Sequence, residues 1–333
     1  MRRTIVTTFV ALAGTAFMVG CPSSQPGTAG GGTTSSGGAS GGTKVAVVTN
    51  CVADFWLIAK AGAEKADTEL DDVSVRFEMP AQGTPEEQKA IVDGLLADGV
   101  KGIAISPKDP ANQTTFLDSV ADKAILITQD SDAPESKRRV YIGTDNLAAG
   151  KQAGELVKEA LPEGGKIVLF IGTTDQANAK DRIQGVKDAL AGSKIIVVDT
   201  RTDNFDQAKA KTNVTEMLSA NPDVKAMVGL FAYNPPAIVS ALKDAGKLGQ
   251  IKVVGFDEQD ETLQAIKDGH VVGTVVQQPY EFGYQSVKML SSFLKGESPE
   301  IPANKQIIVP TKVIRSADVD AFWSELKKRT GKG

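Results

Sequence analysis

The residues best suited to chemistry in this chain are carboxylates, amides, one guanidinium and aromatic rings that follow short runs of β-branched residues. In the order of the chain, these candidate binding residues are Thr49, Asn50, Phe55, Trp56, Asp130, Asp132, Arg182, Phe205, Phe231, Asn234, Asp257 and Gln277. Carboxylates, amides and guanidinium groups form hydrogen bonds in fixed planar forks, and aromatic faces pack against the C–H faces of sugar rings. The combination is typical of a site for a polyhydroxylated ligand.

Other kinds of site have little support in the sequence. Outside the Gly/Ser/Thr-rich stretch 22–43 it contains no G-x-S-x-G, and it has no Walker loop and no H-E-x-x-H. Its single histidine, His270, is expected at a surface turn. Asp130 and Asp257 could do acid and base work, but they lie in different halves of the chain. Cys51 is expected to be a wall residue without an activated thiolate. We therefore expect no enzyme, no cofactor and no metal.

The elements that position these residues alternate along the chain. Runs of β-branched residues alternate with amphipathic stretches of about a dozen residues, the pattern of βα units around a parallel sheet. We expect strands at 44–49, 74–79, 102–105, 124–128 and 140–142, and again at 166–171, 195–199, 226–230, 252–256 and 273–276. We expect helices at 55–70, 85–97 and 111–123, and then at 146–161, 179–191, 207–220, 236–244 and 261–267. This predicts an α/β fold with two doubly wound, Rossmann-like parallel sheets of about five strands each, and ligand at the carboxyl ends of the strands.

The first residues have the composition of an export signal. Arg2 and Arg3 precede an apolar run over 5–19, which is too short for a confident transmembrane helix. Residues 17–22 resemble the bacterial lipobox, with Met18 where leucine is usual, so we expect a signal peptide over 1–21 and lipid attachment at Cys21. Residues 22–43, almost all Gly, Ser, Thr, Ala and Pro, are expected to be a flexible tether with a span of roughly 25 Å.

Composition excludes further partners. Loss of Arg2 and Arg3 with the signal would leave 35 of the 37 basic residues against 41 acidic ones, a net charge of −6. Nucleic acid is therefore not an expected partner, because it requires a basic face. With Cys21 lipidated, Cys51 would be the only thiol, so no disulfide is expected within the chain.

Six motifs follow one another in order along the chain: Val45-Ala46-Val47-Val48-Thr49 with Asp54-Phe55-Trp56, Leu126-Ile127-Thr128-Gln129-Asp130, Tyr141-Ile142-Gly143-Thr144-Asp145-Asn146, Asp181-Arg182-Ile183-Gln184-Gly185, Asn204-Phe205-Asp206 and Val253-Val254-Gly255-Phe256-Asp257. On these motifs the chain, from residue 44 to about 329, resembles the ribose-binding-like sugar receptors of bacterial ABC importers, type I periplasmic binding proteins related to the ligand domain of the lactose-repressor family. The resemblance implies a monomeric, periplasmic or cell-surface sugar receptor whose membrane partner is an ABC permease.

The resemblance also implies the architecture of the receptor. One lobe would comprise 44–144 and 279–309, and the other 145–278 and 310–330. The chain would cross between them near Thr144, Gln277 and Val309, which forms a three-strand hinge around a ligand cleft. Ligand that contacts both lobes would favour the closed form. A membrane sensor in place of the permease is the alternative partner.

Individual roles follow from the same resemblance. Phe55, Trp56 and Phe205 would enclose the sugar ring, Thr49 would line the first-strand loop, and Asp130, Arg182, Asp257 and Gln277 would bind ring hydroxyls. This chain has Ala53, Ser131 and Phe231 where the family usually has Asn, Arg and Asn. These departures predict a ligand smaller, less hydroxylated or differently shaped than ribose. The segments 130–132 and 231–236 are also similar to receptors for rhamnose and for the furanosyl signal autoinducer-2.

Simpler roles remain open for several of these residues. Asp257 and Asp54 could be helix caps or turn residues. One of Phe55 and Trp56 could pack into the core, because they begin a predicted helix. Arg182, inside a predicted helix, could form a solvated ion pair.

Overall fold

The computed structural model describes residues 41–332. The expected signal peptide, the lipid-attachment residue Cys21 and residues 22–40 of the expected tether lie outside the described residues. The first strand, β1 (Thr43–Val48), begins at the last residue of that expected tether.

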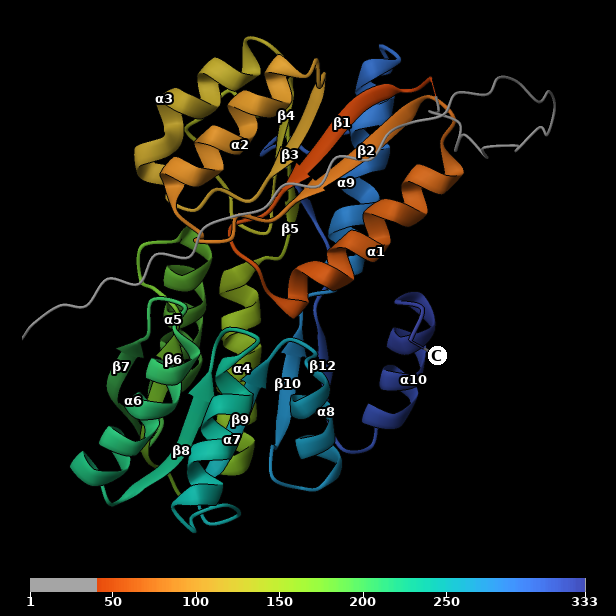
Figure 1. The fold of residues 1–333 in the computed structure, drawn as a ribbon. Coiled ribbons are helices and arrows are strands. Elements are labelled where there is room, and N and C mark those ends of the chain that lie inside the picture. The colour runs from red at the N-terminus through yellow and green to blue at the C-terminus, as the bar shows by residue number, and fades with distance from the viewer. Residues whose placement is uncertain (1–40, 333) are drawn as a thin grey trace, which may run out of the picture. The chain divides into compact units, whose positions relative to one another are not determined.

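The first domain contains a six-stranded sheet in the order β11-β5-β4-β3-β1-β2 (Figure 1). Its strands are β1, β2 (Val73–Glu78), β3 (Gly102–Ile105), β4 (Ile125–Gln129), β5 (Tyr141–Gly143) and β11 (Gln306–Ile308). Its helices are α1 (Asp54–Glu69), α2 (Pro85–Ala97), α3 (Pro110–Ala121) and α9 (Pro279–Leu294). All strand pairs in this sheet are parallel.

The second domain contains a six-stranded sheet in the order β12-β10-β9-β8-β6-β7. Its strands are β6 (Gly165–Ile171), β7 (Ile195–Thr202), β8 (Val224–Gly229), β9 (Lys252–Phe256), β10 (Gly273–Val276) and β12 (Lys312–Ile314). Its helices are α4 (Asn146–Ala160), α5 (Ala177–Leu190), α6 (Gln207–Ala220), α7 (Asn234–Asp244), α8 (Asp260–Lys267) and α10 (Val319–Arg329). Only the edge strand β12 is antiparallel to its neighbour.

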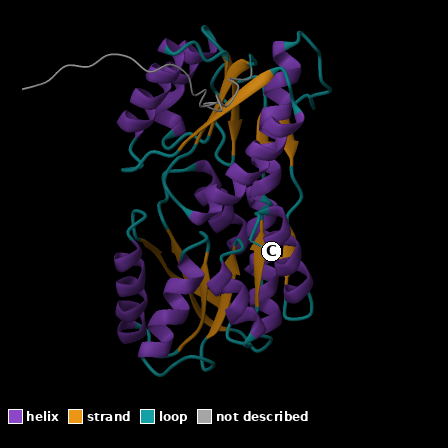
Figure 2. Ribbon diagram, turned by 45° about the vertical axis from the view of Figure 1, so that its right-hand side comes forward, coloured by secondary structure: helices purple, strands orange, loops and turns teal. Residues whose placement is uncertain are grey.

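Helices cover both faces of each sheet, as Figure 2 shows. In β1, Val45 and Val47 pack with α1 and α9, whereas Ala46 and Val48 pack with α2 and α3. Because successive side chains of a strand point to opposite faces, a strand buried on both faces must be continuously apolar. Each valine so buried contributes about 1.5–3 kcal/mol to stability. The second sheet is enclosed in the same way by α4 and α5 on one face and by α6, α7, α8 and α10 on the other. The fold class expected from the sequence is therefore confirmed.

Two edge strands were not expected. β11 and β12 are three residues each, and they extend each expected five-stranded sheet to six. Their sequences, QII and KVI, are too short to give a periodic signal, and tertiary pairing with β5 and β10 defines them. Between them, at residues 309–311, the chain passes from one sheet to the other. The other two crossings follow β5 and β10, which gives three in all.

Helix α5, which carries Arg182, packs closely against α4. A Cβ atom on Gly185 would lie 2.2 Å from the carbonyl oxygen of Leu147, and one on Gly150 would lie 2.3 Å from that of Arg182. Real Cβ atoms do not approach backbone this closely, so the two helices require glycine where they cross. This contact fixes the backbone that carries Arg182.

Within residues 41–332, no helix is long and apolar enough to cross a membrane. In the same part of the chain, no group of three or more His, Cys, Asp or Glu residues is arranged to hold a metal ion, and Cys51 is a free thiol.

Candidate ligand-binding site

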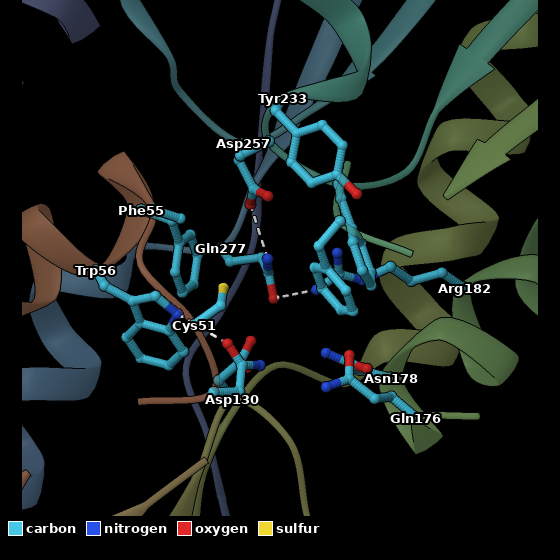
Figure 3. Close-up of a pocket in the computed structure, with 15 residues that line it drawn as sticks. Cys51, Phe55, Trp56, Asp130, Gln176, Asn178, Arg182, Tyr233, Asp257 and Gln277 are labelled. Atoms are coloured by element: carbon cyan, nitrogen blue, oxygen red, sulfur yellow. Dashed lines mark hydrogen bonds between the residues drawn. The ribbon is translucent and has the colours of Figure 1, made fainter. Parts of the chain in front are cut away.

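A partly open cavity lies at the carboxyl ends of the strands and is lined by both domains (Figure 3). The space inside it, counted out to its open mouth, is about 430 Å³. The lining residues are Asn50, Cys51, Ala53, Phe55, Trp56, Asp130, Gln176, Asn178, Arg182, Phe205, Phe231, Ala232, Tyr233, Asp257 and Gln277. Figure 3 shows Phe55 and Trp56 on one side and Arg182, Gln176 and Asn178 on the other.

Asp130 directly follows β4 and has a left-handed backbone, with φ of 59°. One carboxylate oxygen, Oδ2, accepts hydrogen bonds from Ser106 Oγ at 2.8 Å and from Asn50 Nδ2 at 3.4 Å. The other oxygen has no hydrogen-bond partner among residues 41–332. Burial raises the pKa of Asp130, and the charge of Arg182 and the bond from Ser106 oppose that rise. Asp130 therefore presents one unpaired acceptor oxygen at the end of the first sheet.

Two aromatic rings form the wall beside this carboxylate. Phe55 and Trp56 begin α1, and their ring centroids lie 5.0 Å apart in an edge-to-face arrangement. Trp56 Nε1 donates to Asn50 Oδ1 at 3.0 Å, so Asn50 links the indole to Asp130. Both rings line the cavity and also belong to the buried core of the first domain. The two roles considered for these residues therefore coexist.

Arg182 is the buried cation of the second domain, with 1% of its surface exposed. Its donors reach only neutral acceptors: Nε bonds Asn146 Oδ1 at 3.0 Å, and the terminal nitrogens bond the carbonyl of Leu230 at 2.7 Å and Gln277 Oε1 at 2.5 Å. The guanidinium also lies 4.6 Å from the ring centroid of Phe256. The solvated ion pair considered for Arg182 is thus not present.

Gln277 connects Arg182 to Asp257, as the dashed lines in Figure 3 show. Its amide oxygen accepts from Arg182, and its Nε2 donates to Asp257 Oδ1 at 2.7 Å. The second oxygen of Asp257 has no hydrogen-bond partner among residues 41–332. Asp257 has φ of 65° and does not cap α8, whose N-cap is Gln259.

The Asp257 carboxyl titrates close to neutral pH. Burial raises its pKa from the ordinary value of 3.8 to about 6, and Arg182 and the bond from Gln277 limit the rise. The adjacent Glu258 is also buried, and its pKa is raised well above the ordinary value by burial and by the charge of Asp257. The single bond from Gln277 orients Asp257, and burial makes the ionised form of this carboxyl costly.

A second aromatic wall comes from the second domain. The ring centroids of Phe205 and Phe231 lie 5.8 Å apart with an interplanar angle of 31°. In the same domain, Asp203 accepts hydrogen bonds from the hydroxyl of Tyr233 and, at 3.0 Å, from Asn234 Nδ2. Asp203 therefore fixes the loop that carries Phe231 and Tyr233.

The structure brings nine of the twelve expected binding residues to this cavity. They are Asn50, Phe55, Trp56, Asp130, Arg182, Phe205, Phe231, Asp257 and Gln277. The other three are outside the lining and have structural partners instead. Thr49 donates to the carbonyl of Cys51 at 2.8 Å, Asp132 pairs with the buried Arg138, and Asn234 bonds Asp203.

The remaining lining residues are not among those twelve: Cys51, Ala53, Gln176, Asn178, Ala232 and Tyr233. Gln176 and Asn178 begin α5 after β6, in a polar stretch at a strand end, so the rule that identified Asp130 also pointed to them. Ala53 and Ala232 have no polar side-chain group, so nothing in the sequence pointed to them as cavity residues. Cys51, expected as a wall residue, lines the cavity, and burial raises the pKa of its thiol to about 11.

Known proteins are similar to this chain in sequence and in fold. The profile of the periplasmic binding protein domain matches residues 45–298. The ribose import binding protein RbsB of Haemophilus influenzae is 31% identical over 261 residues, which cover 76% of this chain and 87% of that protein. The D-ribose/D-allose-binding protein of Pseudomonas aeruginosa is 26% identical over 284 residues, 81% of this chain and 88% of that protein. The solved structure of an ABC transporter solute binding protein from Burkholderia graminis, in complex with D-arabinose, superimposes with a TM-score of 0.78 at 29% identity, covering 83% of this chain and 96% of that chain. The chain belongs to the periplasmic binding protein family.

Proposed function

We propose that this chain is an extracytoplasmic receptor that binds one small neutral sugar or polyol in the cavity between its two domains and delivers it to an ABC-type permease. The observation that carries the proposal is the pairing of two aromatic walls with polar atoms that lack partners in the described part of the chain. Aromatic faces pack on the C–H faces of a sugar ring while its hydroxyls hydrogen-bond at the edge.

The unpartnered atoms fit hydroxyl groups. Asp130 and Asp257 each have one acceptor oxygen free, and Gln176 Oε1 is buried with no hydrogen-bond partner among residues 41–332. A hydroxyl can donate to each of them and still accept from an amide such as that of Asn178. Leaving a buried polar atom unpaired costs about 1–3 kcal/mol, so a ligand that bonds Gln176 Oε1 removes that cost. Its bonds to the two carboxylate oxygens would add further affinity.

Charge and shape narrow the ligand class. Two buried carboxylates against one guanidinium disfavour sugar acids and sugar phosphates. Ala53, Phe231 and Ala232 make part of the wall apolar. A pentose or deoxysugar, with fewer hydroxyls than a hexose, leaves fewer polar groups against that wall. Relatives named for ribose and a neighbour solved with D-arabinose support this size.

The binding mechanism is hinge closure. The lobes comprise 44–144 with 279–309 and 145–278 with 310–330, and the ligand contacts both. A shift from a mostly open to a mostly closed population requires on the order of 5 kcal/mol of preference for the closed form. The receptor is a monomer without catalytic activity, exported by the signal over 1–21 and held at the membrane through lipidated Cys21.

The first test is a thermal-shift panel. The protein is unfolded, stripped of carried ligand, refolded and heated with pentoses, hexoses, deoxysugars, polyols and, as negative controls, gluconate and ribose 5-phosphate. One neutral class should raise the melting temperature in a concentration-dependent way, by an amount set by ligand concentration over Kd. Asp130→Asn should abolish the rise. No response from a properly refolded protein, or a response to the anions, would contradict the proposal.

Tryptophan fluorescence provides a matched control. The chain has two tryptophans, and Trp56 lines the cavity whereas Trp323 lies on α10 outside it. The Trp323→Phe variant should retain a sugar-dependent change in fluorescence, and Trp56→Phe should lose it. The opposite pattern would place the ligand elsewhere.

A further inference from the structure

One contact between the two domains does not belong to the sugar-binding set. Lys108 lies in the loop between β3 and α3, in the first domain, and its ammonium nitrogen is 3.2 Å from the ring centroid of Phe205 in the second domain. Phe205 itself lines the cavity. The same ring therefore touches the ligand space and a cation from the opposite domain.

The ammonium of Lys108 occupies an unusual environment. Burial lowers its pKa, and among residues 41–332 Cys51 is the only titratable neighbour that opposes this; no carboxylate does. A half-buried lysine without a neighbouring carboxylate loses part of its hydration free energy. Another group that attracts the cation must offset this loss. The face of an aromatic ring is such a group, and a desolvated cation–π contact is stronger than an exposed one.

Phe205 is held in a costly conformation beneath this cation. Asn204 and Phe205 have φ of 57° and 66°, in the left-handed region that non-glycine residues seldom adopt. The Asn204 N–H bonds the carbonyl of Gly172 at 2.7 Å, and the Phe205 N–H bonds Asp203 Oδ1 at 2.8 Å. The turn is thus stabilised locally, and Lys108 fixes the side chain that the turn presents.

A second contact joins the same two places. Gln176 Nε2 donates to the carbonyl of Lys108 at 3.4 Å, and Gln176 Oε1 is the buried acceptor without a partner in the described chain. On its own side, the Lys108 N–H bonds Gln88 Oε1 at 3.2 Å, and Gln88 Nε2 bonds the carbonyl of Thr49 at 2.8 Å. Lys108 is therefore anchored to the end of β1 and contacts two cavity residues of the other domain.

We propose that Lys108 is a positioning residue that latches the two domains together over the ligand by holding Phe205 and Gln176. A ligand that fills the cavity supports the ring of Phe205 and orders the amide of Gln176, so both contacts to Lys108 strengthen when the site is occupied. The latch slows the release of the ligand, so it lowers koff. This inference rests on the proposed binding of a sugar in the cavity.

Stopped-flow fluorescence of Trp56 with D-ribose and D-arabinose measures the effect on release. Lys108→Ala should raise koff about fivefold to tenfold, the range of a desolvated cation–π contact, and change kon by less than twofold. Lys108→Arg keeps a cation on the ring and should restore slow release. Lys101→Ala, an exposed lysine just before β3, is the control. Unchanged koff in Lys108→Ala, with binding retained, would overturn the latch.

Hydrogen exchange without sugar separates failure of the latch from failure of the proposed function. Amides over 203–207 should exchange severalfold faster in Lys108→Ala and at the wild-type rate in Lys108→Arg and Lys101→Ala. If neither sugar binds the wild-type protein but this exchange difference is present, the contact stands and the ligand assignment fails. If exchange in Lys108→Ala equals that of the wild type, the contact does not hold the domains and the inference is wrong.

Discussion

Replacing Asp257 by asparagine is expected to stabilise the protein at neutral pH while weakening its affinity for sugar. The introduced amide would keep an oxygen to accept the bond from Gln277 Nε2, so the buried network survives the change. The substitution removes the negative charge of Asp257, which burial makes energetically costly in the folded protein. The variant also replaces the free acceptor oxygen that faces the cavity by a donor, so a sugar hydroxyl loses its ionised partner.

The magnitude follows from the two pKa values of Asp257. The folded protein takes up a proton at about pH 6, whereas an unfolded aspartate does so near 3.8. The stabilising effect of that proton is fully present below pH 3.8 and is lost as the pH rises through 6. Complete loss corresponds to about 3 kcal/mol, of which about 2 kcal/mol falls between pH 4.5 and 7.5. The asparagine variant carries no charge at either pH.

Urea unfolding of both proteins at pH 4.5 and 7.5 tests this difference directly. The free energy of unfolding of Asp257→Asn, minus that of the wild type, should be about 2 kcal/mol larger at pH 7.5 than at pH 4.5. Glu258→Gln is the matched control, because Glu258 is equally buried but does not line the cavity, so it should also favour stability at neutral pH while sugar affinity stays within twofold. A stability difference between Asp257→Asn and wild type that is the same at both pH values would refute the reasoning.

Three further outcomes are expected. Sugar affinity, measured by calorimetry, should fall about tenfold between pH 7 and pH 5 as Asp257 takes up its proton at about pH 6. Asp257→Asn should remove this pH dependence. An equally steep loss of affinity in the variant would assign the pH dependence to another group. Gly185→Ala should lower the free energy of unfolding by about 1–3 kcal/mol, because its Cβ would lie 2.2 Å from a backbone oxygen of α4. Gly94→Ala, with open space around it in α2, should raise the free energy of unfolding by about 0.5–1 kcal/mol. Equal effects of the two substitutions in urea unfolding would contradict the close contact between α4 and α5. Arg138→Met should lower the free energy of unfolding by about 1–3 kcal/mol, because the half-buried carboxylate of Asp132 loses its ionic partner but keeps the bonds from Thr128 and Gln306. Sugar affinity should stay unchanged, and a matching loss of affinity would assign Asp132 to the binding site.

The spacing of apolar residues along the sequence was sufficient to predict most of the strands and helices. β1 is apolar at every position from Val45 to Val48 because both faces are buried there, and that pattern is visible without coordinates. β7 continues to Thr202, three residues beyond the expected end at 199, because pairing with β6 extends through polar residues. β11 and β12 exist only because the chain crosses beside β5 and β10, and no local pattern encodes that pairing.

The lining of the cavity was predictable where a side chain follows a strand directly. Asp130 and Asp257 are in this position, and both lie at the cavity with left-handed backbones. Asp132 shows where the rule fails. It is two residues farther along, and the buried Arg138 takes both of its oxygens. Strand-end position indicates that a polar residue is near the site, but the nearest partner decides which way it points.

The segments where the chain passes between the two sheets do more than connect them, because residues beside two of these crossings bind the buried cation of the cavity. Arg182 receives its acceptors from Asn146, just after the first crossing, and from Gln277, at the second. Asn146, Arg182 and Gln277 all lie within residues 145–278, so a rotation about the crossings would carry the guanidinium and these two acceptors together. With only 1% of its surface exposed, Arg182 therefore ties the residues beside two crossings to α5, where solvent cannot readily replace its partners. A ligand that bonds Asp257 would meet a carboxylate that Gln277 and Arg182 already hold in position.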